Sequence, residues 1–315
     1  MDIIDIHTHG IGGYDTRTTD IEHILRIAEL QGAEGVTAII PTLYPAPIKV
    51  MRESMLLVKK AMERQKDLSN PLSPSFSKGG LSEAIDPARI ADRTSRIIGV
   101  HLEGPFLNPS KCGALNAMTF LEPIEHHLEE LIDGFEDVVK IITLAPELEG
   151  ATQLIKKLTD RGIIVSMGHS EATYAQAEEG FNAGAKGITH LFNAMSGFHH
   201  REPGLAGFGL MNRDVYIEVI ADPYHLHPKT LEYILRTKHP ERIIIVSDAV
   251  KETHTPSARE GVVDRHGTLL GGAMTIPEAL RKLTQTGFDG DALLRCVSEN
   301  PVRYLNVSSR ATYDV

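Results

Sequence analysis

The chain has 315 residues, of which 42% are hydrophobic, and its formal net charge is −10. This length suits one large or two ordinary soluble domains, and the acidic balance argues against nucleic acid or an anionic membrane as the main partner. No apolar run approaches the ~20 residues of a membrane span. The two cysteines, Cys112 and Cys296, suit a reducing compartment better than a disulfide framework. We therefore expect a cytoplasmic protein, and we expect no signal peptide because Met1 leads directly into a strand-like run.

The first strand-like run, residues 1–4, leads into a His-Thr-His sequence formed by His7, Thr8 and His9. Residues i and i+2 of a strand point the same way, so the two imidazoles can be directed at one point. Imidazole is a common metal ligand. Two nearby histidines also occur without a metal, so this motif alone leaves both interpretations open.

Strand-like and helix-like runs alternate along the rest of the chain. Further strands are predicted at 35–40 (ended by Pro41), 97–102, 138–144, 163–167, 187–190, 215–221 and 242–246. Helices are predicted at 19–31, 47–66, 122–134, 149–161 and 171–183, a surface loop at 69–80, a hairpin turn at 264–267, and two helices at the end. This alternation predicts an α/β fold, a (β/α)8 TIM barrel that occupies residues 1–315 as a single domain.

An open, doubly wound sheet is the alternative fold. It commonly carries a Gly-x-Gly-x-x-Gly sequence directly after the first strand. Here His-Thr-His stands at that position. The barrel is therefore the favoured prediction.

Histidines and carboxylates follow the ends of several predicted strands. The active site of a (β/α)8 barrel lies at the C-terminal ends of its strands, so these side chains should surround one opening. The residues concerned are His7, His9, Glu103, His169, His190, His225 and Asp248. Imidazole and carboxylate ligands without thiolate suit zinc, iron or a similar divalent ion. The pattern predicts a metal-dependent site at the barrel mouth.

The sequence resembles the amidohydrolase superfamily and, within it, the N-acetylglucosamine-6-phosphate deacetylases. The resemblance covers nearly the whole chain and rests on specific segments: His-Thr-His-Gly at 7–10, Gly-Val-His-Leu-Glu-Gly-Pro-Phe-Leu-Asn-Pro at 99–109, Thr-Leu-Ala-Pro-Glu at 143–147, Gly-His-Ser-Glu-Ala-Thr-Tyr at 168–174, Thr-His-Leu-Phe-Asn-Ala-Met-Ser at 189–196, His-His-Arg-Glu-Pro-Gly at 199–204 and Asn-Pro at 300–301. It implies a metal-dependent hydrolase that converts N-acetylglucosamine 6-phosphate to glucosamine 6-phosphate and acetate.

The resemblance also implies which residues hold the metal. In this family the ligands are the residues that match Glu103, His169 and His190. Members that keep His-x-His can bind a second ion there, so His7 and His9 allow a two-ion site with Glu103 as the bridge. The expectation is one or two divalent ions per subunit.

The resemblance assigns the remaining roles to residues of the later strands and loops. The residue matching Asp248 is the general base and then the acid, which suits the physical need to activate water against an amide. The residue matching His225 orients or polarises the substrate carbonyl. Those matching Asn193, Ala194 and Arg201 hold the sugar phosphate. Since that arginine can serve the neighbouring subunit's site, a homodimer is expected.

Two features depart from the family pattern. Relatives carry a small β-sandwich, which we expect to be absent here because the sequence starts at the barrel. Leu115 stands where relatives have a histidine that contacts the substrate, and leucine cannot donate a hydrogen bond. We expect Cys112, in the same loop, to be inert, and Lys140, near the start of its strand, to be structural.

Leu115 keeps other functions open. One alternative is an amidohydrolase of the same type that acts on a different N-acyl compound or on a cyclic amide. Another is a catalytically inactive barrel used for binding. The presence of Asp248 together with every metal ligand argues against the inactive barrel, because a site without chemistry has no need for a base.

Overall fold

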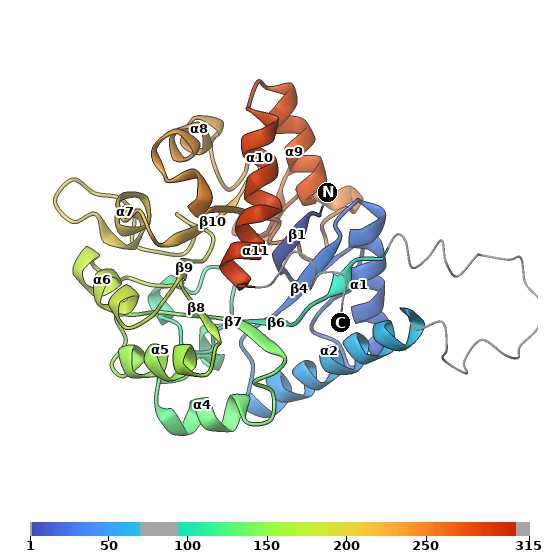
Figure 1. The fold of residues 1–315 in the computed structure, drawn as a ribbon, viewed down its shortest axis with the longest axis horizontal. Helices are drawn as coiled ribbons and strands as arrows, with labels where there is room; N and C mark the ends of the chain where they lie inside the picture. Colours follow the sequence, from blue (N-terminus) through green and yellow to red (C-terminus); the bar gives the residue numbers. More distant parts are fainter. Residues whose placement is uncertain (1, 70–93, 307–315) are drawn as a thin grey trace, which may run out of the picture.

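A barrel of parallel strands forms the centre of the computed structural model, which describes residues 2–69 and 94–306 (Figure 1). The strands follow one another around the barrel in the order β1-β4-β6-β7-β8-β9-β10-β11, with β5 paired beside β4. Their bounds are β1 Ile4–Thr8, β4 Ala38–Leu43, β5 Arg96–Ile97, β6 Val100–Glu103, β7 Val139–Leu144, β8 Ile164–Met167, β9 Gly187–Ile188, β10 Tyr216–Ile220 and β11 Ile243–Val246. The predicted (β/α)8 barrel is thereby confirmed.

Two backbone hydrogen bonds connect the end of the last strand to the first strand. The Asp248 N–H donates to the His7 carbonyl at 2.9 Å, and the His9 N–H donates to the Ala249 carbonyl at 2.7 Å. Both bonds lie at the C-terminal ends of β1 and β11. They therefore join the first strand to the last strand at the end of the barrel where the predicted metal ligands lie.

Helices pack around the strands as an outer layer (Figure 1). They are α1 Ile21–Ala33, α2 Ile48–Ser69, α4 Glu125–Ile132, α5 Ala151–Asp160, α6 Tyr174–Asn182, α7 Gly204–Met211, α8 Pro228–Thr237, α9 Ile276–Gln285, α10 Gly290–Val297 and α11 Glu299–Leu305. At some of these helices, a side chain at the N-terminus satisfies free N–H groups. Thr173 and Gln176 form a capping box at α6, and Asp20 accepts a hydrogen bond from the Glu22 N–H at α1.

The predicted helices between residues 19 and 183 correspond to α1, α2, α4, α5 and α6, whereas α7 and α8 were not predicted. The sequence of α7, Gly-Leu-Ala-Gly-Phe-Gly-Leu-Met, is buried almost throughout. A helix that is apolar on all sides has no 3.6-residue alternation, so periodicity does not reveal it. The chain also ends in three helices, α9, α10 and α11, where two were predicted.

Pro41 lies inside β4, so the prediction that the strand ends before it was wrong. β4 pairs with β5 through Ala38 and Ile39, and it pairs with β6 through Thr42 and Leu43. Pro41 therefore lies between two ladders, where its missing N–H removes little pairing.

The two ends of the barrel differ in polarity. At the N-terminal end, Tyr304 of α11 is fully buried among the side chains of Ile4, Ile6 and Ile244. An added Cβ at Gly187 would lie 2.2 Å from the Tyr304 hydroxyl, so glycine leaves the room that this ring occupies. Polar side chains occupy the opposite end, and the apolar packing below them gives the site a rigid base.

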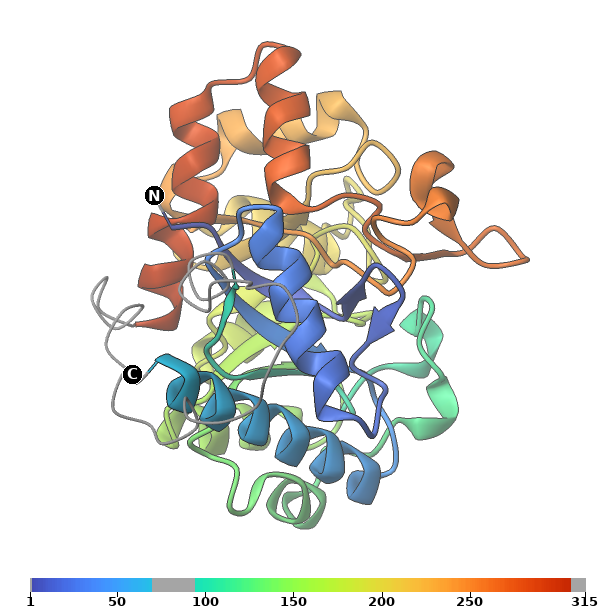
Figure 2. The same ribbon diagram turned by 90° about the vertical axis from the view of Figure 1, so that its right-hand side faces the viewer.

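Two short hairpins stand at the polar end of the barrel. They are β2 Gly10–Ile11 with β3 Tyr14–Asp15, and β12 Val262–Val263 with β13 Leu269–Gly271. Figure 2 shows both on the same side of the barrel as the segment that follows β6. The second one confirms the predicted hairpin at 264–267, where the Asp264 N–H donates to the Thr268 carbonyl at 2.9 Å.

Some predictions are not tested by the described residues. Apart from the last residue of α2, the predicted loop at 69–80 falls outside the described residues. Among the described residues, none of the helices combines the length and the apolar character needed to cross a bilayer. The single-domain organisation without a β-sandwich stays a prediction.

Candidate metal centre and active site

Six potential metal ligands from the barrel strands and the residues just after them lie together at the mouth. Glu103, His169 and His190 form the first group. The two Nε2 atoms each lie 3.1 Å from Glu103 Oε1, and they are 3.1 Å from each other. Neighbouring ligand atoms around tetrahedral zinc stand about 3.4 Å apart. The spacing of these three atoms therefore fits one divalent ion.

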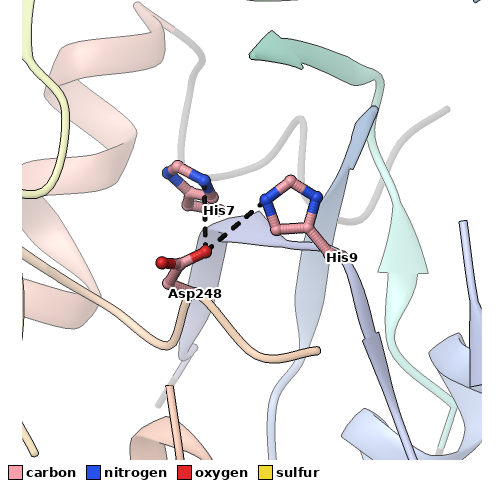
Figure 3. Close-up of side chains that lie close together, drawn as sticks. All are labelled: His7, His9 and Asp248. Carbon is pink, nitrogen blue, oxygen red and sulfur yellow. Dashed lines mark ion pairs between the residues drawn. The ribbon is translucent and has the colours of Figure 1, made fainter. Parts of the chain in front are cut away.

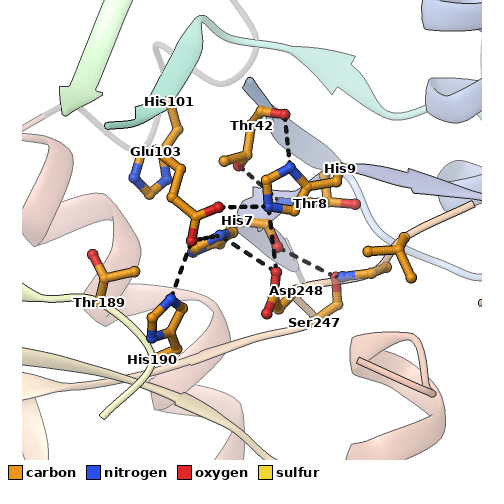
Figure 4. A network of polar contacts seen from close by, with 12 residues as sticks. His7, Thr8, His9, Thr42, His101, Glu103, Thr189, His190, Ser247 and Asp248 are labelled. Carbon is orange, nitrogen blue, oxygen red and sulfur yellow. Dashed lines mark hydrogen bonds and ion pairs between the residues drawn. The ribbon is translucent and has the colours of Figure 1, made fainter. Parts of the chain in front are cut away.

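His7, His9 and Asp248 form the second group (Figure 3). Asp248 Oδ1 lies 3.4 Å from His7 Nε2 and 3.5 Å from His9 Nε2. Glu103 stands between the two groups, as Figure 4 shows: its Oε1 is 3.6 Å from His7 Nε2, and its Oε2 is 3.2 Å from His9 Nε2. One carboxylate thus reaches both groups, which is the arrangement of a bridging ligand.

Three of the ligands leave their strands through an uncommon backbone conformation. His169, His190 and Asp248 have φ values of 49°, 31° and 47°. Residues other than glycine rarely adopt positive φ, and the conformation costs of order 1–3 kcal/mol. Each of these residues lies one or two positions after the end of β8, β9 or β11. The sharp turn directs their side chains across the mouth instead of along the strand.

The partners of the imidazoles fix which nitrogen carries the hydrogen. His169 Nδ1 lies 2.8 Å from the Lys111 carbonyl, and His9 Nδ1 lies 3.0 Å from the Thr42 carbonyl. A carbonyl only accepts, so Nδ1 holds the hydrogen and Nε2 keeps its lone pair for a metal. Burial holds the pKa of His7 well below its usual value, so this imidazole is also neutral.

The two carboxylates of the centre differ in proton affinity. Burial raises the pKa of Glu103, but the close contacts with the imidazoles of His169, His190 and His9 outweigh burial, so the pKa lies well below the usual value. Burial, followed by the negative charge of Glu103, raises the pKa of Asp248 well above its usual value. Two buried carboxylates so close together repel each other, and a divalent cation between them removes that repulsion.

A cavity of about 420 Å³ opens above the metal-binding groups, and Glu103, His169, His190 and Asp248 are among its lining residues. His225 lines it as well, and its Nδ1 lies 3.0 Å from both carboxylate oxygens of Asp222. This size suits a small molecule. Asp248 and His225 therefore face the same cavity.

The proposed phosphate ligands divide into two sets. Asn193 and Ala194 line the cavity, and Asn193 Nδ2 donates to the His190 carbonyl at 3.2 Å. Arg201 is exposed in the loop before α7 and is not among the lining residues of its own chain's cavity. Leu115, in contrast, does line the cavity. The described geometry therefore does not bring Arg201 to the cavity of its own chain.

The two residues expected to be without a catalytic role are not members of the ligand groups. Cys112 is half-buried in the loop after β6 and is absent from the cavity lining. Lys140 lies near the start of β7, at the opposite end from the mouth, and its Nζ donates to the Asp137 carbonyl at 2.8 Å.

Four residues that support the centre were not predicted from the sequence. Glu218 of β10 accepts from His7, and Asp222 holds His225. The Tyr44 ring stacks on His9 with centroids 3.9 Å apart, and the Arg17 guanidinium lies 4.1 Å from the Tyr44 centroid. Glu218 did leave a signal, since it is the one charged residue within the buried strand Tyr-Ile-Glu-Val-Ile.

Residues 3–311 match the amidohydrolase family. Because this match spans nearly the whole sequence and the barrel carries the ligand groups described above, the chain belongs to that family. It is 30% identical over 317 residues to the N-acetylgalactosamine-6-phosphate deacetylase of Escherichia coli O157:H7, which covers 96% of this chain and 77% of the relative. It is also 30% identical over 293 residues to the N-acetylglucosamine-6-phosphate deacetylase of Vibrio furnissii, covering 89% and 67%.

A solved structure of a relative gives the same fold. It is a mutant of N-acetyl-D-glucosamine-6-phosphate deacetylase from Mycobacterium smegmatis in complex with N-acetyl-D-glucosamine-6-phosphate. The TM-score is 0.79 at 27% identity, and the alignment covers 97% of this chain and 77% of the relative. The named relatives share a 6-phosphorylated N-acetyl amino sugar as the molecule in their names.

Proposed function

We propose that this amidohydrolase is a metal-dependent deacetylase that converts N-acetylglucosamine 6-phosphate to glucosamine 6-phosphate and acetate. The observation that carries the proposal is the position of Asp248, which belongs to a metal-binding group and also lines the cavity. A carboxylate in that position can exchange a proton with a molecule bound there. The names of the relatives support the substrate class.

The chain's own residues suit amide hydrolysis. Glu103, His169 and His190 would hold a divalent ion, for example zinc or iron. Such an ion would lower the pKa of a water molecule from about 15.7 toward 7. Asp248 would accept a proton from the attacking water and later pass it to the leaving amine, acting as general base and then as general acid. In its imidazolium form, in which both ring nitrogens carry a hydrogen, His225 would donate from Nδ1 to Asp222 and from Nε2 to the carbonyl oxygen as negative charge develops on it.

The phosphate end of the substrate lies, in this proposal, against Asn193 and Ala194. Arg201 completes the site from a second copy of the chain, because its planar guanidinium suits a phosphate and it is exposed outside its own cavity. The functional unit is then a homodimer. We also propose a cytoplasmic location, because the two cysteines are free and free cysteines are typical of a reducing compartment.

A different N-acyl substrate is the second candidate, and the composition of the cavity wall favours it. Leu115, Val250, Leu269 and Leu270 all line the cavity. These apolar side chains pack against an apolar substituent better than against sugar hydroxyls. The metal chemistry would be unchanged, and only the group beside the amide would differ.

A substrate panel tests the two candidates. Purified protein with added Zn²⁺ or Fe²⁺ is incubated with the N-acetylated 6-phosphates of glucosamine and galactosamine, with phosphate-free N-acetylglucosamine, with N-acetyl amino acids and with a cyclic amide, and released acetate or amine is measured. We expect the highest kcat/KM for a 6-phosphorylated sugar. Equal kcat/KM with and without the phosphate would contradict the first candidate. No turnover of any compound by metal-loaded protein would favour the inactive barrel.

A further inference from the structure

A buried carboxylate lies directly beneath the second ligand group. Glu218 is in the middle of β10, with 1% of its surface exposed, and its neighbours Ile217 and Val219 are fully buried. Its Oε2 lies 3.1 Å from His7 Nδ1. A carboxylate in the interior of a barrel is costly unless it is paired, so this contact requires an explanation.

The contact determines the state of His7. An ionised Glu218 carboxylate only accepts hydrogen bonds, so Nδ1 of the neutral His7 ring then carries the hydrogen and Nε2 carries the lone pair. That Nε2 is buried and has no hydrogen-bond partner among residues 2–69 and 94–306. Two carboxylate oxygens lie close to it, Asp248 Oδ1 at 3.4 Å and Glu103 Oε1 at 3.6 Å. A lone pair that faces two carboxylates is the environment of a cation ligand.

The other histidine ligands are oriented differently. The backbone carbonyls of Thr42 and Lys111 hold His9 and His169, and His190 Nδ1 has no partner in the described part of the chain. Glu218 is therefore, within the described ranges, the one side chain that contacts Nδ1 of a ligand imidazole through a hydrogen bond. A carboxylate also makes the imidazole it accepts from more basic, which a carbonyl does to a smaller degree.

We propose that Glu218 is the positioning residue that directs the His7 lone pair toward Asp248 and thereby raises the affinity of the expected second cation site at His7, His9 and Asp248. Among the described residues, the side chains of Glu103, His169 and His190 form no hydrogen bond with the Glu218 side chain, so we expect their site to keep its ion when Glu218 is changed. The proposal rests on metal binding alone and not on the identity of the substrate.

Metal titration of Glu218 variants tests this role. Metal-free protein is titrated with Zn²⁺ by calorimetry in the presence of a competing chelator, and bound zinc is counted after dialysis. We expect two classes of site in the unaltered protein. Loss of a residue that orients a metal ligand typically weakens binding about 10- to 100-fold. Glu218→Gln should weaken binding at the site of His7, His9 and Asp248 about 10-fold, and Glu218→Ala about 100-fold. The affinity of the site formed by Glu103, His169 and His190 should not change.

His101→Gln is the matched control. His101 is equally buried, and its ring centroid lies 4.7 Å from that of His7. Its nitrogens contact the Ile6 carbonyl at 3.1 Å and Thr143 Oγ1 at 2.8 Å, and they do not contact a ligand. The control should keep both classes of site. An equal loss in His101→Gln and Glu218→Gln would show a general packing effect and would overturn the proposal.

Two further results would also overturn it: a single class of site in the unaltered protein, or unchanged binding of two ions by Glu218→Gln. If Glu218→Ala does not fold, the isosteric glutamine variant carries the test. Ring nitrogen shifts in metal-free protein give a separate readout, and hydrogen on His7 Nε2 in place of Nδ1 would contradict the proposal. None of these outcomes alters the proposed deacetylation, which needs only the other site.

Discussion

Replacing Asp248 by asparagine tests the role of this residue as the base while leaving the fold intact. Asparagine has the same shape and tolerates the positive φ of 47° at this position, whereas alanine would be strained there. The Asp248 N–H that closes the barrel at 2.9 Å belongs to the backbone and is retained. Because only 13% of the side chain is exposed, solvent is a poor substitute for the missing carboxylate. We expect a folded protein that lacks its proton acceptor.

The size of the effect follows from the two proton transfers assigned to Asp248. General acid–base catalysis is typically worth 10²- to 10⁴-fold, which corresponds to about 3–5 kcal/mol of activation free energy. The assay is kcat for release of acetate from N-acetylglucosamine 6-phosphate, measured together with zinc content and Tm. Metal at Glu103, His169 and His190 should remain. Turnover close to that of the unaltered protein, with metal bound, would refute the assignment of the base.

Three further variants and one labelling experiment have defined outcomes. His169→Ala combined with His190→Ala should remove the ion held with Glu103, and elemental analysis showing undiminished metal would contradict this. Leu115→His restores a donor at the cavity wall and should raise kcat/KM for N-acetylglucosamine 6-phosphate; an unchanged or lower value would count against that substrate. Arg201→Met removes a charge-assisted bond of about 1.5–3 kcal/mol, so KM should rise roughly ten- to a hundredfold for phosphorylated substrates only, and light scattering should show a dimer. Burial raises the pKa of Cys296 to about 12, so at pH 8 a thiol reagent should label it only after unfolding.

The alternation of strands and helices made the barrel predictable, although local boundaries were less certain. The apolar runs ending at Glu103, His169 and His190 mark strand ends, and the C-terminal ends of parallel strands meet at one edge. The prediction that the strand ends before Pro41 was wrong, because a proline fits inside β4 only where the neighbouring strands do not need its N–H. The helix α7 was missed because it is buried on all sides.

The sequence by itself determined the fold and the chemical types of side chain that surround the mouth, since periodicity and strand ends are local properties. Only the tertiary structure decided how these side chains are grouped. Glu103 stands between two sets of ligands, and Glu218 contacts His7 from 211 positions away. Such contacts depend on barrel closure and strand register, which no local pattern specifies. The exposed position of Arg201, away from its own cavity, is likewise a consequence of how the loop before α7 folds.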